Sequence, residues 1–207
     1  REVAAPGCIL LNYSNPNAMV TWACNKYGKV ETYGLCHGVQ HGHEQIAKAL
    51  GREKKDVDII CAGLNHQTWY ISVKTDGAER TGELFELMKK AEFAKDENIR
   101  LDVMKNFGYY STESNGHLSE YLMWYRKRPE DMEKWINYSS WIQGETAGYL
   151  RVCKESRNWF ETDFPNWLKE PAKKFTPENR SSEHGSYIIE GLETGRVYRG
   201  HFNIMNN

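Results

Sequence analysis

The clearest strand in this sequence is DVDIICAGL, Asp56–Leu64, a stretch of β-branched and apolar residues. A second apolar stretch, Trp69–Val73, follows at a short interval and ends at a turn that contains Asp76 and Gly77. Helical spacing of apolar residues then takes over, most clearly in Asn98–Phe107. Because strands come first and helices follow, we expect a mixed α/β domain of the α+β type.

Upstream of this strand, residues 7–12 and Val30–Leu35 each predict a further strand, and the helix between them is expected to end near Gly28. We expect a turn-rich stretch around Gly38 and Gly42. These two strands add to the expected mixed architecture.

Downstream, Glu130–Lys154 predicts mostly helix, whereas residues 156–185 are rich in Trp, Phe, Pro, Asn and Glu and predict irregular structure. The tail, Ser186–Asn203, regains the residue types of a strand. We find no repeat, no low-complexity tract and no linker long enough to divide the chain.

The composition is that of an ordinary globular protein of 207 residues, with 40% hydrophobic and 13% aromatic residues to build a core. The formal net charge of -1 lacks the basic excess that a nucleic acid or an anionic membrane would favour. No apolar run approaches the roughly 20 residues that span a bilayer, and no secretory signal opens the chain. Five cysteines at irregular spacing indicate a reducing compartment, so we expect a cytoplasmic protein.

Cys36 and His37 follow the predicted strand Val30–Leu35 and lie between two glycines. Glycines let the backbone approach a ligand closely, and a thiolate beside an imidazole can bind a metal or act as a nucleophile. The alternative is that Cys36 is a small buried hydrophobic residue, the commoner role of an isolated cysteine.

Asn65 and His66 follow the strand that ends at Leu64. Ligands bind at the open ends of strands in α/β folds, so these two polar side chains are candidates for a binding site. The alternative is a histidine that serves only as a hydrogen-bonded structural residue.

His41 and His43 extend the motif to Cys-His-x3-His-x-His, which could indicate a zinc site. Structural zinc usually takes paired ligands from two separate elements, however, and the chain has no Cys-x2-Cys partner. We interpret His41 and His43 as lining a pocket or a partner contact.

The stretch Gly108–Tyr121 is dense in polar and aromatic residues, a mixture that suits a sugar because aromatic faces cover C–H surfaces and polar groups bind hydroxyls. It also suits a capped helix start with Ser114 or Asn115 as N-cap, and both readings can hold. The chain contains no G-x-G-x-x-G, G-x4-G-K-[ST] or G-x-S-x-G motif, so it has no dinucleotide or triphosphate loop of its own.

Together, these motifs resemble glycoside hydrolase family four, in its α-galactosidase (melibiase) branch. Their order and intervals fit along nearly the whole chain, and the combination is specific although each piece alone is not. The stretches that carry the resemblance are Leu11–Met19, Gly34–Gln40, Cys61–His66 and Gly108–Tyr121, with weaker similarity at Trp159–Pro165 and Glu183–Tyr187.

The resemblance implies a fold similar to lactate and malate dehydrogenases, in which an N-terminal Rossmann domain precedes a mixed α/β catalytic domain. On this basis we expect residues 1–207 to be an internal fragment, mostly the C-terminal catalytic and metal-binding domain, with the Rossmann domain absent. The end of the nucleotide-binding domain is expected within residues 1–35. We also expect a homo-oligomer.

The activity that the resemblance implies is NAD- and Mn²⁺-dependent hydrolysis of α-galactosides, a carbohydrate-metabolism reaction outside the two-carboxylate glycosidase scheme. NAD⁺ takes hydride from C3 of galactose, a base removes the C2 proton, and the aglycone leaves C1 with help from an acid. Water then adds and the hydride returns. A divalent cation on O2 and O3 stabilises the charge that develops on deprotonation.

Carried over by motif, Cys36 and His66 are the expected Mn²⁺ ligands, although manganese usually prefers oxygen to a thiolate. Asn15 and Asn65 are the expected substrate-binding amides. His37 matches the position of the general acid.

The base that removes the C2 proton is expected at His117, since a neutral imidazole can accept a proton near pH 7. Tyr109 and Tyr110 are the alternatives for this role.

Other activities of the same family stay open, namely α-glucosidase, α-galacturonidase and 6-phospho-glycosidase. The lack of an evident phosphate-binding cluster disfavours the last. The alternative of another class is an inactive sugar- or metal-binding fragment. We expect the 207-residue chain alone to be inactive, because it has no nucleotide-binding loop of its own.

Overall fold

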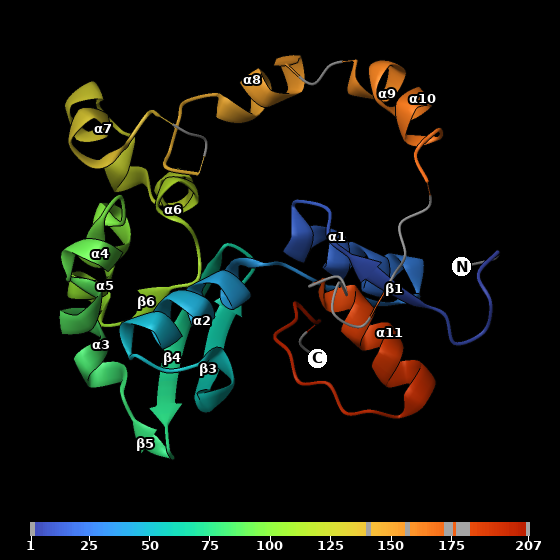
Figure 1. The fold of residues 1–207 in the computed structure, drawn as a ribbon, viewed down its shortest axis with the longest axis horizontal. Coiled ribbons are helices and arrows are strands. Elements are labelled where there is room, and N and C mark those ends of the chain that lie inside the picture. Colours follow the sequence, from blue (N-terminus) through green and yellow to red (C-terminus); the bar gives the residue numbers. More distant parts are fainter. Residues whose placement is uncertain (1–2, 140–141, 156–157, 172–175, 177–182, 206–207) are drawn as a thin grey trace.

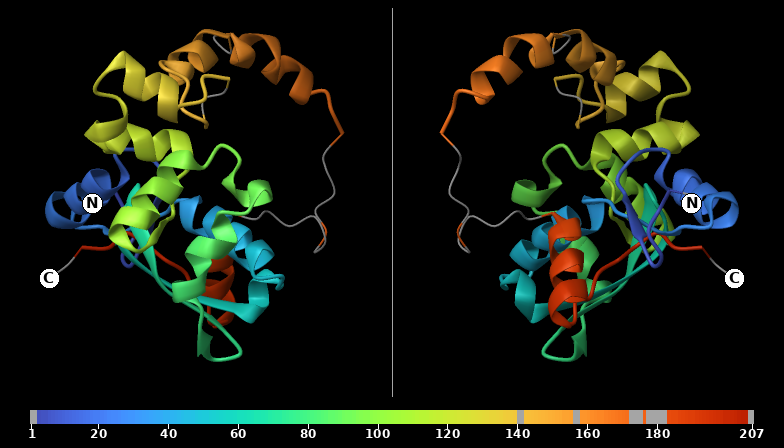
Figure 2. Two further views of the ribbon diagram at one scale, coloured as in Figure 1. Left: turned by 90° about the vertical axis from the view of Figure 1, so that its left-hand side faces the viewer. Right: turned by 90° about the vertical axis from the view of Figure 1, so that its right-hand side faces the viewer.

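The computed structural model of the chain describes residues 3–139, 142–155, 158–171, 176 and 183–205. It is a mixed α/β protein with two separate sheets (Figure 1), which confirms the predicted fold class. The two sheets and their helices lie on opposite sides of the molecule in Figure 1, and a series of short helices forms an arc that is visible in Figures 1 and 2.

The smaller sheet is a parallel pair of strands, β1 (Ile9–Asn12) and β2 (Glu31–Gly34). The connection between them contains α1 (Asn17–Ala23) and a π-helix, Cys24–Gly28. Parallel strands need such a crossover connection, and the two strands and the helix were predicted from sequence. The connection brings the carboxyl ends of β1 and β2 side by side.

The larger sheet is antiparallel throughout and follows the order β3-β4-β5, with β6 also paired to β4. Leu64 pairs with Gln67 in the register, so Asn65 and His66 form the tight turn between the first two strands. The strands are β3 (Val57–Leu64), β4 (Gln67–Thr75), β5 (Ala78–Glu79) and β6 (Tyr110–Ser111).

The helices connect and cover these sheets. Along the chain, α2 (Gly38–Ala49) follows the smaller sheet, and a 3-10 turn, Lys54–Asp56, leads from it into β3. Beside the larger sheet lie α3 (Thr81–Met88), α4 (Ala91–Ala94), α5 (Asn98–Phe107) and α6 (Asn115–Tyr121), with a 3-10 turn at Met123–Tyr125. The arc is α7 (Pro129–Trp135), α8 (Gly148–Glu155), α9 (Trp159–Thr162) and α10 (Phe164–Trp167), and α11 (His184–Thr194) follows.

The tail Ser186–Asn203 was predicted as strand, and this prediction was wrong. Its first half belongs to α11, which packs on the smaller sheet because Ile188 and Leu192, four residues apart, face Ile9 across a small apolar hollow. The helix ends at Gly195, whose φ of 74° lies in the left-handed region that glycine adopts readily. Tertiary packing therefore overrides the strand preference of the β-branched residues in this segment.

The turn predicted around Gly38 and Gly42 was also wrong, because both glycines lie in α2. They mark close packing: a Cβ on Gly42 would lie 2.9 Å from Cζ of Tyr70, and one on Gly38 would lie 3.1 Å from the carbonyl oxygen of Thr112. The glycines thus allow α2 to lie close to the larger sheet.

The predicted helical stretch Glu130–Lys154 is interrupted between α7 and α8. Gly144 (φ 119°) and Ala147 (φ 57°) have left-handed backbone, which a right-handed helix cannot contain. Within the irregular region predicted at residues 156–185, the described part contains the short helices α9 and α10. In the described part of the chain, no helix combines the length and apolar character needed to cross a bilayer.

The main core lies between α2, the larger sheet and α3. Tyr70 and Val73 of β4, Leu84 of α3 and Ile46 of α2 are all fully buried there. The hydroxyl of Tyr70 donates to the carbonyl oxygen of Val39 at 2.6 Å, which fixes the ring against the first turns of α2.

Because the Tyr70 ring is fixed, replacing Gly42 by Ala is expected to overpack this contact. We expect Gly42→Ala to lower the free energy of unfolding by ~1–3 kcal/mol. The control is Gly82→Ala in α3, where a Cβ meets no atom within 4 Å, so stability should stay the same or rise by up to about 1 kcal/mol. Urea denaturation measures both, and equal midpoints for the two variants would contradict this packing account.

Candidate functional site

The turn between β3 and β4 presents Asn65 and His66 beside a cavity. His66 has a φ of 65°, in the left-handed region, where histidine is found more often than β-branched residues. The backbone N–H of Asn65 donates to Oδ1 of Asn203 at 2.8 Å. The prediction that the strand ends in polar groups at this point is confirmed.

Cys36 follows β2 and is held by a contact from the far end of the chain. Nε2 of His184 lies 3.1 Å from the carbonyl oxygen of Cys36, while Nδ1 of His184 lies 2.9 Å from the Tyr198 hydroxyl. His184 is only 3% exposed. The imidazole therefore donates from Nε2 to Cys36, and Nδ1 accepts from Tyr198.

Asn203 joins the two sheets at the same place. Its backbone N–H and carbonyl each hydrogen-bond Gly34 at 2.9 Å, so it extends the edge of β2. Its side chain accepts from the N–H of Asn65 and donates to Oδ1 of Asn17 at 3.2 Å. One side chain thus ties the ends of β2 and α1 to the β3–β4 turn.

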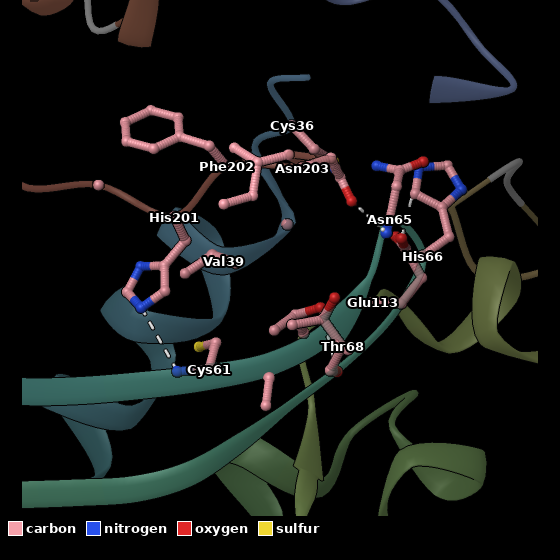
Figure 3. Close-up of a pocket in the computed structure, with 16 residues that line it drawn as sticks. Cys36, Val39, Cys61, Asn65, His66, Thr68, Glu113, His201, Phe202 and Asn203 are labelled. Atoms are coloured by element: carbon pink, nitrogen blue, oxygen red, sulfur yellow. Dashed lines mark hydrogen bonds and ion pairs between the residues drawn. The ribbon is translucent and has the colours of Figure 1, made fainter. Parts of the chain in front are cut away.

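The cavity between these elements has a volume of about 320 Å³. Cys36 and His66 both line it, together with Asn65, Glu113 and Asn203 (Figure 3). Residues separated widely in sequence therefore form one polar wall. Among the described residues, the lining contains neither Lys nor Arg.

Burial, helped by the Glu113 carboxylate, raises the pKa of the Cys36 thiol, and three hydrogen-bond donors oppose part of this rise. These donors are the backbone N–H groups of Gly38 and His37 and the side-chain amide of Asn65. Cys61 lines the same cavity, and burial raises the pKa of its thiol to about 12. Cys36 is therefore the better supported thiolate of the two.

His66 lies among three groups that hold or carry protons. Its Nδ1 is 2.6 Å from the Tyr121 hydroxyl, its Nε2 is 3.6 Å from a carboxylate oxygen of Glu113, and its ring stacks on His117 with centroids 5.8 Å apart. Burial lowers the pKa of His66, although the Glu113 carboxylate opposes that shift. When a neutral His66 forms its hydrogen bond to the Tyr121 hydroxyl through Nδ1, its Nε2 faces the Glu113 carboxylate.

The donor set fits a cation that keeps coordination positions open. The described residues contain no group of three or more His, Cys, Asp or Glu placed to hold a metal ion together. Cys36 and His66 would supply two ligands on the cavity wall, leaving the remaining positions to oxygens of a bound molecule. A closed structural zinc site does not fit, and His41 and His43 line a different cavity.

His37 faces this second cavity, which has a volume of about 620 Å³. Its Nε2 lies 2.7 Å from a carboxylate oxygen of Glu183, and its ring stacks between those of Tyr13 and His41, with centroids 5.7 and 6.1 Å away. The hydrogen bond from His37 lowers the pKa of Glu183. His41 and His43 line the cavity as well, so their interpretation as pocket residues is confirmed.

The other predicted site residues lie at varying distance from these cavities. His117 stacks on His66 and its Nδ1 is 3.1 Å from Glu120. Asn15 lies in the loop before α1, where its Oδ1 accepts from the N–H of Asn17, and it does not line either cavity. Tyr109 is 43% exposed and lies outside both cavities.

Tyr110, the other alternative base, is fully buried beneath the guanidinium of Arg100, which lies 4.0 Å from its ring centroid. Burial raises the pKa of its hydroxyl strongly. Of the predicted bases, His117 is the one that the structure brings to His66.

Sequence reasoning missed several residues that build the site. Glu113 and Tyr121 belong to the polar and aromatic stretch after α5, but no role was given to them individually. Asn203 and His184 act through contacts with Asn65 and Cys36 over 138 and 148 residues. No local spacing could reveal such contacts.

Comparison with known families matches most of the chain. The Family 4 glycosyl hydrolase C-terminal domain matches residues 61–207, and Family 4 glycosyl hydrolase matches residues 2–52. The chain belongs to the family 4 glycosyl hydrolases, as its motifs indicated.

Two curated relatives of this chain are alpha-galactosidases. The chain is 57% identical to the one from Rhizobium meliloti (strain 1021) over 211 residues, which cover 100% of this chain and 43% of the relative. It is 35% identical to the one from Bacillus subtilis (strain 168) over 209 residues, covering 99% of this chain and 46% of the relative. The chain thus spans less than half the length of these relatives.

Solved structures share the fold at lower identity. A putative glucosidase, lplD, from Bacillus subtilis has a TM-score of 0.63 at 20% identity, covering 92% of this chain and 46% of that one. The 6-phospho-beta glucosidase from Thermotoga maritima, solved with manganese, NAD+ and glucose-6-phosphate, has a TM-score of 0.59 at 20% identity. That match covers 92% of this chain and 41% of the other.

The bridging role of Asn203 leads to a prediction about stability. Asn203→Ala should lower the free energy of unfolding by ~1–3 kcal/mol, because the buried partners of its side chain lose a hydrogen bond. It should also speed hydrogen exchange at the Asn65 N–H. The control is Asn106→Ala, since the exposed Asn106 amide donates to the carbonyl oxygen of Asp102 in its own helix, and it should stay within about 0.5 kcal/mol of the parent. Unchanged exchange at Asn65 would show that the bridge does not hold the turn.

Proposed function

We propose that the protein to which this chain belongs is an α-galactosidase that depends on NAD and Mn²⁺. The proposal rests on one observation: Cys36 and His66 follow strands of two different sheets, and both line the same cavity. The 57% identity to the alpha-galactosidase of Rhizobium meliloti supports the sugar specificity. The manganese and NAD+ in the Thermotoga maritima structure support the cofactors.

Cys36 and His66 would hold Mn²⁺. Bound there, the ion supplies positive charge next to sugar oxygens when a neighbouring carbon loses its proton. Ligation through Nε2 of His66 leaves the proton on Nδ1, which then donates to the Tyr121 hydroxyl. Asn65 donates to the Cys36 thiolate, so it positions one ligand directly.

NAD would supply the hydride acceptor. The chain contains no glycine-rich dinucleotide loop, so we assign none of its residues to NAD and derive no step from them. In the relatives more than half of the length lies outside the region matched by this chain.

Two histidines would move the protons. His117 would accept the proton from C2, since its ring stacks on that of His66, which lines the cavity. His37 would donate to the glycosidic oxygen, with Glu183 holding the ring by a hydrogen bond at 2.7 Å. Asn15 and Asn65 remain the proposed substrate amides, and of these Asn65 lines the cavity.

The charge of the first cavity favours an uncharged sugar over a sugar phosphate or a uronic acid. Its described lining has the Glu113 carboxylate and no Lys or Arg to pair with an anionic substituent. The alternatives within the family, α-galacturonidase and 6-phospho-glycosidase, would require such a cation. Charge does not distinguish an α-glucosidase from an α-galactosidase, and the identity to alpha-galactosidases favours galactose.

The protein is also proposed to be a cytoplasmic homo-oligomer. Its five cysteines are all free, which supports a reducing compartment. The homo-oligomer rests on the sequence resemblance alone.

The test uses the full-length protein supplied with Mn²⁺ and NAD⁺. We expect hydrolysis of p-nitrophenyl α-galactoside with a kcat/KM at least tenfold above that for the α-glucoside, the α-galacturonide or a 6-phosphogalactoside. Deuterium at C2 should slow turnover, because His117 must remove that proton. Preference for an anionic sugar would refute the assignment of substrate, and the lack of an isotope effect together with activity in the absence of NAD⁺ would refute the mechanism.

A further inference from the structure

The two cavities adjoin and share part of their lining. Val39, Gly200 and His201 line both cavities. The neighbouring residues Cys36 and His37 are divided between them, because Cys36 lines the first and His37 the second. A sugar held at the Cys36 side would therefore have His37, the proposed proton donor, on the side of the second cavity.

The start of α11 fixes this division. Glu183 binds the His37 ring, His184 donates to the Cys36 carbonyl, and the N–H of Gly185 donates to the Tyr13 hydroxyl at 3.0 Å. Tyr187, one turn further, lines the second cavity and stacks on Tyr198 at 5.5 Å. The helix that positions the proposed metal ligand and acid thus also builds a wall of the second cavity.

The second cavity has the chemistry of a site for a neutral polyol. Tyr187 and Tyr198 offer aromatic surface, and Gln40, His41 and Arg199 offer hydrogen-bonding groups. The formal charges in its lining balance. The two carboxylates are Glu44 and Asp58, and the two cations are Lys54 and Arg199, of which Lys54 pairs with Glu44 at 2.7 Å. Its volume of about 620 Å³ lies within the range of ordinary small-molecule sites.

We propose that this second cavity binds the leaving part of the substrate, and that Arg199 and Tyr187 select an uncharged sugar there. The inference rests on the proposed function, because it takes the galactose unit to lie in the first cavity and His37 to protonate the bond between the two units. Arg199 and Tyr187 determine specificity for the leaving sugar and take no part in the chemistry.

The test compares melibiose, whose leaving group is glucose, with methyl α-galactoside, whose leaving group is methanol. Both leaving groups are alkoxides that need a proton from the acid, so damage to acid catalysis lowers both rates. In the full-length protein, Arg199→Ala and Tyr187→Ala should each lower the ratio of kcat/KM for melibiose to that for methyl α-galactoside by about tenfold, or 1.4 kcal/mol. Because both rates come from one sample, the ratio does not depend on the fraction of folded protein.

The matched control is Arg196→Ala, which removes an arginine from the same segment but outside the second cavity, where it pairs with Glu190 at 3.1 Å. Its ratio should stay within twofold of the parent. An unchanged ratio in both cavity variants, or an equal fall in the control, overturns the inference. Neither result affects the proposed function, which depends on the galactosidase activity of the parent protein. If the parent protein hydrolyses neither galactoside, that result contradicts the proposed function itself, and with it the inference.

Discussion

The hydrogen bonds of Asn203 are the constraint on which the rest of the site depends. This residue pairs with Gly34 through its backbone and with Asn65 and Asn17 through its side chain. The two sheets share no strand, so the relative position of their ends depends on contacts of this kind. An asparagine suits the task because its amide carries both a donor and an acceptor.

That constraint explains how two weak sequence signals become one site. Cys36 lies just beyond Gly34, and His66 follows Asn65, so fixing Gly34 and Asn65 to one residue brings the thiol and the imidazole to one cavity wall. The surrounding groups then distinguish Cys36 from Cys61. Three hydrogen-bond donors oppose the rise that burial causes in the pKa of the Cys36 thiol. For Cys61, burial acts alone and raises the pKa to about 12. Both cysteines are partly buried, so burial by itself would not separate them.

Local pattern predicted much of the fold, because strand β3 and helix α5 carry their periodicity in consecutive residues. It also placed Asn65 and His66 correctly at a strand end. It failed where packing decides the outcome: α11 is a helix despite Tyr187, Ile188 and Ile189, because it lies on the smaller sheet. The glycines of α2 serve a close approach to Tyr70 and Thr112 that only the folded chain reveals.

The contributions of Asn203 and His184 could not be predicted from sequence for the same reason. Each acts on a partner more than 130 residues away, through one or two atoms, and such pairs have no period or spacing. The motif resemblance located the candidate ligands, and the structure supplies the contacts that hold them together.

The most direct test of the account is the Mn²⁺ affinity of the full-length protein with one cysteine of the cavity replaced at a time. Cys36→Ser should weaken Mn²⁺ binding by more than about 100-fold, since even changes beyond the ligands themselves cost 10–100-fold at metal sites. Cys61→Ser, in the same cavity, should leave the affinity within a few-fold of the parent. Equal affinities in the parent and both variants would contradict the assignment of Cys36 as a metal ligand.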